Sequence, residues 1–210
     1  MKVQKGYNTW AKIYDTNPNK TRDLEGVALR ETLASYTFDQ VLELGCGTGK
    51  NTFWLADRAK SLVGLDISEE MLAIAKEKNK YPNVRLQLAD IQQDWDALDN
   101  SIDLVSCSLT LEHIEDLNII FAQAAKKLQP NGLFYICELH PFKQYLGTKA
   151  RFEVDGKLIE LVVFIHHVSE FLEVAKNNGF ELVSLKEWFD ENENGKLPRL
   201  VSFVFKTASV

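Results

Sequence analysis

The sequence predicts an α/β fold, with helices on both faces of a mainly parallel sheet. Short apolar stretches that suit buried strands alternate with helical patterns along the first two thirds of the chain. A glycine-rich turn joins the first strand to a helix, which makes half of a βαβ unit. Such alternation is typical of parallel sheets that are buried on both sides. The strands are expected at residues 41–44, 61–66, 84–89, 102–106 and 133–137.

Further elements complete the expected domain. Helices are predicted at residues 22–36, 114–128 and 169–178, and two last strands at 180–187 and 200–206. A chain of 210 residues is long enough for one α/β domain and not for two, so a single domain over residues 1–210 is expected. The helix at 22–36 shows a mixed face made of Leu24, Val27, Ala28, Glu31 and Leu33.

The composition is that of a soluble, acidic protein. Hydrophobic residues make up 45% of the chain, charged residues 26%, and the formal net charge is −6. A negative protein repels polyanions, so no nucleic-acid partner is expected. The sequence has no apolar signal core and no run of about 18 to 20 apolar residues, which predicts a cytoplasmic protein without membrane insertion. A monomer or homodimer is expected.

The three cysteines, Cys46, Cys107 and Cys137, are far apart and lie in or beside apolar strands. No CxxC pair or neighbouring histidine stands at ligand spacing, so they are interpreted as buried thiols in a reducing compartment. No cluster of acids suited to a divalent ion is visible either. The sequence therefore predicts no metal.

The turn in VLELGCGTGKNT, residues 41–52, indicates a ligand site. Its glycines let the chain turn sharply and let a ligand approach the backbone, while the next helix points its first amides there. A phosphate-binding loop would need a glycine in place of Leu44 and Ser or Thr in place of Asn51. A dinucleotide site would need a third glycine in place of Lys50, which weakens an NAD-dependent oxidoreductase without excluding it.

The remaining pattern is an acid at the strand end followed by GxGxG. ELGCGTG resembles motif I of the class I S-adenosylmethionine (SAM) dependent methyltransferases, in the small-molecule and quinone-biosynthesis-like branch of methyltransferase type 11. The resemblance implies SAM as cofactor, S-adenosylhomocysteine (SAH) as product, and a Rossmann-like, doubly wound, seven-stranded sheet of order 3214576 with strand 7 antiparallel. It also implies that the loop packs against the methionine part of SAM, with cofactor contacts from Glu43, Gly45, Cys46, Gly47, Thr48 and Gly49.

Acidic residues also end the next two strands. Asp66 lies about 20 residues beyond the first glycine, where doubly wound folds place a carboxylate that binds both ribose hydroxyls. Ser68 is the expected N-cap of the next helix, which leaves Asp66 for a ligand. The resemblance implies that Asp90 meets the adenine amino group, although it could equally cap a turn. Further cofactor contacts are expected from Ile67, Met71, Ile91 and Ser108.

Two segments are expected to cover the site. Tyr7, Trp10 and Tyr14 form an aromatic stripe on a short helix, and residues 1–36 resemble the segment that small-molecule methyltransferases fold over SAM. Aromatic faces stabilise a sulfonium charge, although a helix merely docked on the core remains an alternative. A hairpin that turns at Asp155 and Gly156 is expected within an insertion at 139–167. Ligands bind beyond the carboxyl ends of such strands, so this insertion is a candidate substrate cover.

Methyl transfer is an in-line displacement that depends mainly on alignment and exclusion of water. A base is needed only where the acceptor must lose a proton. The candidates are the four histidines, of which His113 and His140 rank first because they follow strands four and five, ahead of His166 and His167. Each could equally be structural. The region after strand four lacks the [DN]PP[YF] motif of DNA amino-methyltransferases and the paired glutamates of protein arginine methyltransferases. A small, partly apolar acceptor methylated on oxygen, nitrogen or carbon is therefore expected, and a SAM-binding module without transferase activity stays open.

Overall fold

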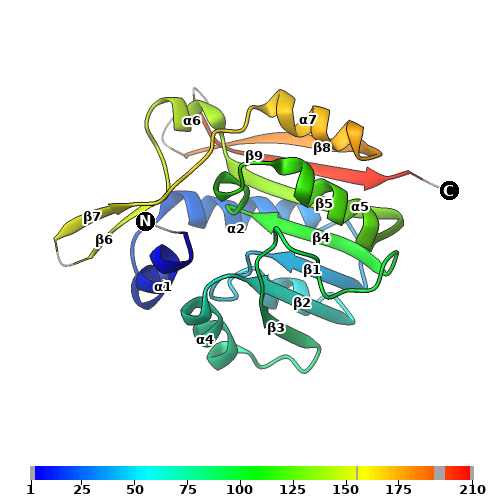
Figure 1. Cartoon of the computed structure of the whole chain (residues 1–210), viewed down its shortest axis with the longest axis horizontal. Coiled ribbons are helices and arrows are strands. Elements are labelled where there is room, and N and C mark those ends of the chain that lie inside the picture. Colours follow the sequence, from blue (N-terminus) through cyan, green and yellow to red (C-terminus); the bar gives the residue numbers. More distant parts are fainter. Residues whose placement is uncertain (1–2, 155, 192–196, 209–210) are drawn as a thin grey trace.

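A computed structural model gives the fold of residues 3–154, 156–191 and 197–208 (Figure 1). Its centre is a seven-stranded sheet in the order β3-β2-β1-β4-β5-β9-β8. The strands from β1 to β5 are parallel, and β9 runs antiparallel to both β5 and β8. The predicted order with an antiparallel seventh strand is thus confirmed. The strands are β1 Gln40–Leu44, β2 Ser61–Asp66, β3 Val84–Leu88, β4 Ile102–Ser108, β5 Leu128–Leu139, β8 Phe180–Phe189 and β9 Pro198–Thr207.

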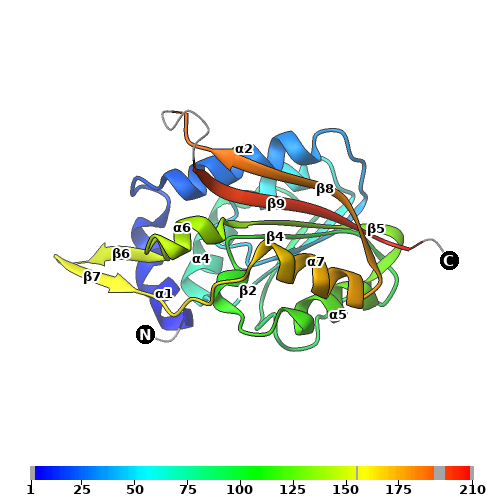
Figure 2. The same ribbon diagram turned by 90° about the horizontal axis from the view of Figure 1, so that it is seen from above.

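Helices cover both faces of this sheet, because alternate strand residues point to opposite sides. In Figure 2, α2 (Lys20–Leu33) lies on one side of the strands, and α5 (Leu117–Lys127) and α7 (Val168–Asn177) lie on the other. Leu42 packs in the core cluster beneath α5 and α7, whereas its neighbour Val41 packs in the cluster beneath α2 and α3 (Thr52–Ala56). The other helices are α1 Val3–Tyr14, α4 Glu69–Lys78, α6 Pro141–Tyr145 and the 3-10 helix Leu111–His113.

The buried face of α2 differs from the predicted one. Val27 is 46% exposed and Glu31 is exposed as well, whereas Arg22 and Glu25 are buried. Apolar periodicity could not reveal this face, because two charged residues on it are buried by polar partners instead of apolar ones. The helix begins after Asn19, whose side chain accepts a hydrogen bond from the Arg22 amide at 3.0 Å.

Other boundaries move for local reasons. The helix expected at 114–128 begins at Leu117, because Asp116 caps it by accepting from the Asn118 amide at 2.9 Å. The short helix α6 was not predicted. It follows β5 directly, with Pro141 at its first position, where a missing amide hydrogen costs nothing.

A separate hairpin, β6 (Arg151–Val154) and β7 (Lys157–Glu160), stands beside α1 in Figure 1. The hairpin lies within the expected insertion, and Asp155 of the expected turn lies outside the described residues. The ring of Phe152 stacks on that of Trp10, with centroids 4.8 Å apart. The hairpin therefore joins α1 in a small apolar cluster of its own.

Candidate functional site

The carboxyl ends of β1, β2 and β4 open into a cavity beneath α1, which we call the central cavity. Its empty volume, which includes space open to solvent, is about 770 Å³. Residues from the glycine turn, the ends of β2 and β4, the segment after β3, and α1 line it. The fold thus brings together the strand ends that the sequence singled out.

The glycine turn borders this cavity through Gly45 and Gly47, whose φ angles are +70° and +54°. A Cβ built on Gly47 would meet no protein atom within 4 Å, so the space beside this glycine is open for a ligand. Gly45 is confined by the protein itself, since a Cβ there would lie 2.1 Å from Thr110 Oγ1. Gly49 does not line the cavity, and its φ of +86° together with the nearby Phe53 ring gives it a structural role in the turn.

Asp66 lines the central cavity opposite the turn. Its Oδ2 accepts from the Gly47 amide and its Oδ1 from the Ser68 amide, both at 2.8 Å. A carboxylate has about four acceptor positions, so each oxygen can still accept from a ligand. Burial raises the pKa of Asp66 above its usual value, against the effect of these hydrogen bonds. Ser68 caps α4 as predicted, because its side chain accepts from the Met71 amide at 3.2 Å.

The further residues predicted beside the cofactor are gathered at the same cavity. Asp90 lines its wall and also caps a local turn, with its Oδ1 accepting from the Gln92 amide at 3.0 Å. The structure therefore shows the turn cap, and it leaves Asp90 on the cavity wall where a ligand could contact it. The other wall residues from the predicted set are Ile67, Met71, Ile91 and Ser108.

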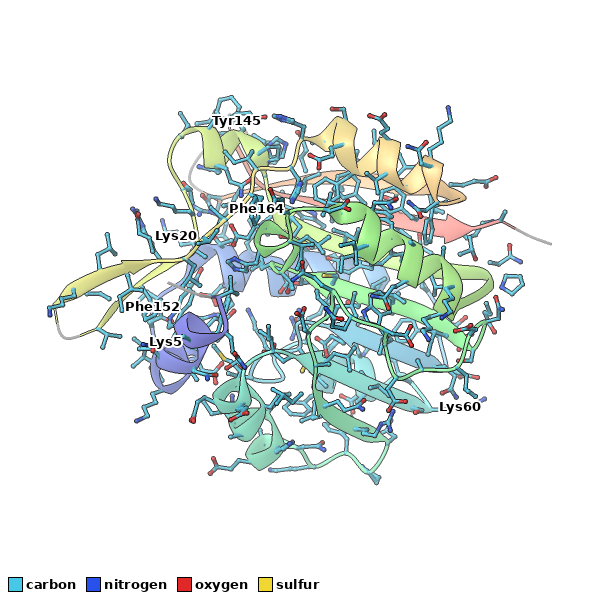
Figure 3. The ribbon with its side chains drawn as sticks, in the orientation of Figure 1. Lys5, Lys20, Lys60, Tyr145, Phe152 and Phe164 are labelled. Carbon is cyan, nitrogen blue, oxygen red and sulfur yellow. The ribbon has the colours of Figure 1, made fainter. Side chains whose placement is uncertain are left out.

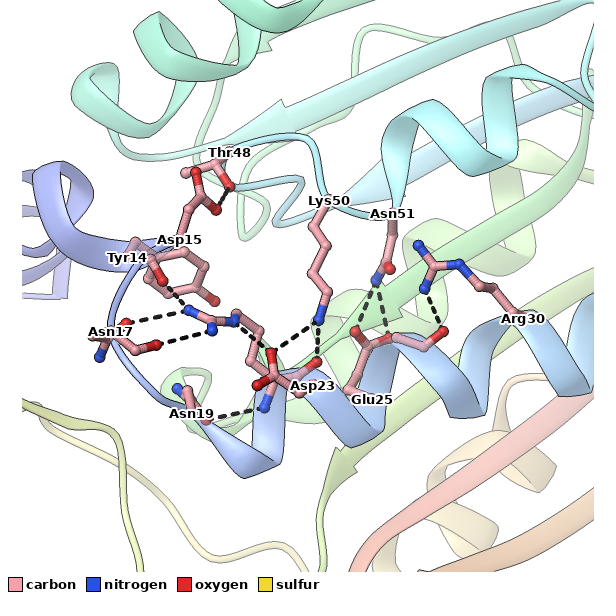
Figure 4. Close-up of polar contacts among 12 residues, drawn as sticks. Tyr14, Asp15, Asn17, Asn19, Asp23, Glu25, Arg30, Thr48, Lys50 and Asn51 are labelled. Atoms are coloured by element: carbon pink, nitrogen blue, oxygen red, sulfur yellow. Dashed lines mark hydrogen bonds and ion pairs between the residues drawn. The ribbon is translucent and has the colours of Figure 1, made fainter.

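A second space, the loop cavity, lies on the other side of Gly45 and Gly47, with an empty volume of about 430 Å³. Glu43 and Cys46 line it, as does Thr48, which donates to Asp15 Oδ1 at 2.7 Å (Figure 4). Glu43 is buried and accepts from Thr52 Oγ1 at 2.5 Å. Burial raises the pKa of Glu43 to about 8. The predicted loop residues therefore face two connected spaces.

Helix α2 supplies a polar wall of the loop cavity that sequence reasoning missed. In Figure 4, Glu25 on α2 faces Asn51, whose Nδ2 donates to both Glu25 carboxylate oxygens at 2.9 and 3.0 Å. Arg22 holds the segment between α1 and α2 by donating to the Asn17 backbone and side chain. Lys50 reaches the same helix by donating to the Arg22 carbonyl. The one signal in the sequence was a pair of opposite charges three residues apart on a helix.

The aromatic stripe of α1 divides between two spaces. Tyr7 and Tyr14 line the central cavity, whereas Trp10 does not. Trp10 stacks on Tyr7 at 5.8 Å, meets Tyr14 edge-on at 5.1 Å, and lies behind both. It lines an outer cavity of about 930 Å³ empty volume, between α1, residues 17–21, residues 148–151 and β9. The structure therefore does not place Trp10 in the central cavity with the other predicted cofactor contacts. The reason is that the three rings on this face of α1 extend over both the central and the outer cavity.

His113 lies at the edge of the central cavity and contacts the stripe. Its Nδ1 is 2.8 Å from the Val162 carbonyl oxygen, which can only accept, so Nδ1 carries the hydrogen. Its Nε2, 2.9 Å from the Tyr7 hydroxyl, therefore accepts from that hydroxyl. Burial lowers the pKa of His113, which keeps the ring neutral near pH 7, and burial raises the pKa of Tyr7.

His140 serves a different role. Its Nδ1 accepts from the Phe142 amide at 3.1 Å as the N-cap of α6, and its Nε2 lies 3.0 Å from Glu187 Oε1. It lines neither the central nor the outer cavity. His140, at the end of strand five, thus caps the next helix. The fold does not bring the two predicted bases, His113 and His140, together.

Within the residues that the structure describes, no group of three or more His, Cys, Asp or Glu side chains could hold a metal ion. The three cysteines are free and buried. None of the helices in the described ranges combines the length and apolar character needed to cross a membrane.

Comparison with known proteins finds methyltransferases. The methyltransferase domain family matches residues 42–136, from β1 into β5. An uncharacterized methyltransferase of Emericella nidulans is 28% identical over 217 residues, covering 85% of this chain and 76% of the relative. The demethylmenaquinone methyltransferase of Tropheryma whipplei (strain Twist) is 28% identical over 196 residues, covering 91% and 79%.

Solved structures agree in fold. A SAM-dependent methyltransferase from Clostridium acetobutylicum superposes with a TM-score of 0.73 at 18% identity, covering 97% of this chain and 99% of that one. DhpI, solved as a complex with SAH, gives 0.75 at 21% identity, covering 98% and 95%. The matched methyltransferase domain and these relatives support a SAM-dependent methyltransferase and favour it over the oxidoreductase alternative.

Proposed function

We propose that the chain transfers the methyl group of SAM to a small-molecule acceptor, with the cofactor in the central cavity and its methionine part towards the loop cavity. The observation that carries this assignment is Asp66 at the end of β2, facing a glycine whose missing Cβ leaves open space. Asp66 would hold the ribose, and Asp90 with Ile91 would hold the adenine. SAM supplies an electrophilic methyl group on a sulfonium.

The loop cavity suits the two charges of the methionine part. Glu25 and Glu43 offer carboxyl oxygens to an ammonium, and Arg22 and Lys50 offer donors to a carboxylate. Tyr7 and Tyr14 present ring faces to the central cavity, where aromatic groups stabilise a sulfonium. In this proposal α1 and residues 1–36 form the lid and residues 139–167 the substrate cover.

His113 is the base that this geometry favours where the acceptor loses a proton. Its neutral ring and accepting Nε2, hydrogen-bonded to Tyr7, suit it to take a proton relayed through the Tyr7 hydroxyl. Tyr7 lines both the central cavity, where SAM is proposed to bind, and the neighbouring outer cavity. The name of the T. whipplei relative supports a small ring-bearing acceptor.

The test is ligand-dependent thermal unfolding with SAH, SAM and NAD. SAH at about 100 times its dissociation constant should add about 2.7 kcal/mol, a rise of roughly 5 to 10 °C, and NAD should add none. Asp66→Ala should weaken SAH binding at least tenfold. The matched control is Asp103→Ala, which also removes a carboxylate that accepts from two backbone amides, Asp39 at 2.9 Å and Gln40 at 2.7 Å, outside the cavity lining. Equal SAH affinity in both variants would refute the ribose assignment.

A further inference from the structure

We propose that the outer cavity binds the methyl acceptor through an anionic group, a carboxylate or a phosphate ester carried by a ring-bearing small molecule. This inference rests on the proposed function, because it names the acceptor class of the same site. Tyr7, Tyr14 and Leu109 line both the outer and the central cavity. An acceptor anchored in the outer cavity therefore reaches the proposed methyl donor past these three side chains.

Positive charge surrounds the outer cavity. Two of its cations already hold partners, since Lys149 pairs with Glu160 and Arg199 with Asp190, each at 2.5 Å. The other two are exposed at its rim. Because the whole protein carries a net charge of −6, this local gathering of cations is a deviation that favours an anionic ligand. The four come from separate segments of the chain: Lys20, Lys149, Arg151 and Arg199.

One acid, Glu112, stands among the described residues that line the outer cavity. It is 8% exposed and lies 3.5 Å from the amide nitrogen of Gln144. Burial raises the pKa of Glu112 to about 7, so near neutral pH it carries only part of a negative charge. With Lys149 and Arg199 paired to carboxylates, Lys20 and Arg151 still leave the cavity lining with a net positive charge.

Trp10 adds an unused hydrogen-bond donor. It lines the outer cavity at 4% exposure, and its indole Nε1 is buried without a partner among the described residues. Buried indole N–H groups normally find an acceptor, so an unpaired one calls for an explanation. An oxygen of a bound anion would supply the missing acceptor.

The backbone at Leu109 supports a ligand-contacting role for the window between the cavities. Leu109 has a φ of +51°, a conformation that a residue with a branched side chain rarely adopts. Its amide donates to the Cys137 carbonyl at 2.9 Å, which holds the strained turn after β4. Strain of this kind gathers at binding sites, where it aims a side chain that the ligand needs.

The experiment compares four probes that share one ring: benzoate, phenyl phosphate, benzamide and benzylamine. Each is titrated into SAH-loaded protein and followed by tryptophan fluorescence, because Trp10 lines the cavity. We expect benzoate or phenyl phosphate to bind at least tenfold more tightly than benzamide, and benzylamine to bind most weakly. The better of the two anions distinguishes a carboxylate from a phosphate acceptor. Absence of binding by both anions, or equal binding of benzamide, overturns the proposal.

Variants locate the effect. Lys149→Met with Arg151→Met should abolish the preference for the anions. The control double variant, Arg58→Met with Lys60→Met, removes the same charge away from the cavity lining and should keep the preference. Figure 3 places Lys60 at the opposite end of the molecule from Lys20. Preference retained in the first double variant contradicts the proposal.

A third variant excludes a merely structural effect of Lys149. Glu160→Gln removes the carboxylate that neutralises Lys149 without touching the cavity lining, and it should tighten anion binding about threefold or more. Unchanged or weaker binding counts against the proposal. SAH affinity is measured for every protein. If SAH does not bind the wild type, the proposed function fails by itself, whereas SAH binding without an anion preference refutes only this inference.

Discussion

Gly47 leaves space for a ligand because glycine has a hydrogen atom where other residues have a Cβ. Its φ of +54° makes any other residue strained by about 1 kcal/mol, and its Cβ direction points to open space on the cavity wall. We expect Gly47→Ala to cost about 1 kcal/mol of unfolding free energy and to weaken SAH binding at least tenfold. Chemical denaturation and calorimetric titration measure the two effects.

Gly179 provides the matched control for that substitution. It follows α7 with a φ of +78°, and a Cβ there also meets no atom within 4 Å, so Gly179→Ala carries the same backbone cost. It lies outside the described cavity linings and should leave SAH affinity unchanged. If Gly47→Ala behaves like Gly179→Ala in both measurements, the open space beside the turn does not hold the cofactor.

At the scale of elements, the hairpin β6–β7 holds α1 in place. Phe152 is 3% exposed and stacks on Trp10 at an interplanar angle of 14°. Phe152→Ala should lower the local unfolding free energy of α1 by roughly 3 kcal/mol, at the low end for a buried phenylalanine, while the sheet is unaffected. Amide hydrogen exchange measures the local stability of α1 and of the sheet in the same experiment. Phe142→Ala on α6, where the ring is 40% exposed, is the control and should leave α1 unchanged. Equal exchange of α1 in the two variants would show that the hairpin does not anchor it.

The elements also show how far sequence reasoning reaches. The glycine turn, the acid at position 66 and the sheet order follow from local spacing together with family resemblance, and the structure has them. The outer cavity could not be predicted, because it is assembled from α1, residues 148–151 and β9, which only the fold brings together. Glu25 was missed because its burial depends on Asn51, a polar partner 26 residues away, and not on apolar periodicity.

At the scale of the whole molecule, buried acids should make the ligand-free protein less stable as pH rises. Burial raises the pKa of Glu43 and Glu138 to about 8, whereas an unfolded chain ionises near 4.5. The folded state therefore holds more protons above that value, and stability falls as pH rises through about 8, by at most about 1.4 kcal/mol per pH unit for each group. Burial lowers the pKa of His113, so this group has the opposite effect: it makes the folded protein more stable as pH rises, at lower pH values than the two acids.

Thermal unfolding between pH 6.5 and 8.5 checks this dependence. Glu43→Gln should flatten the decline, because the amide oxygen can still accept from Thr52 but has no proton to lose. The exposed Glu181→Gln should follow the wild type. A wild-type melting temperature that does not fall across this window would contradict the raised pKa values of these acids.

Tyr14 and Leu109 line all three cavities, so the three compartments share these two side chains in their walls. A molecule that orders these two side chains in one space prepares the surface of the others. Binding in one cavity would then change the affinity of a ligand for another cavity. By thermodynamic reciprocity, each of the two ligands changes the affinity of the other by the same factor. If both proposed ligands bind, loss of one product would remove part of the enclosure of the other.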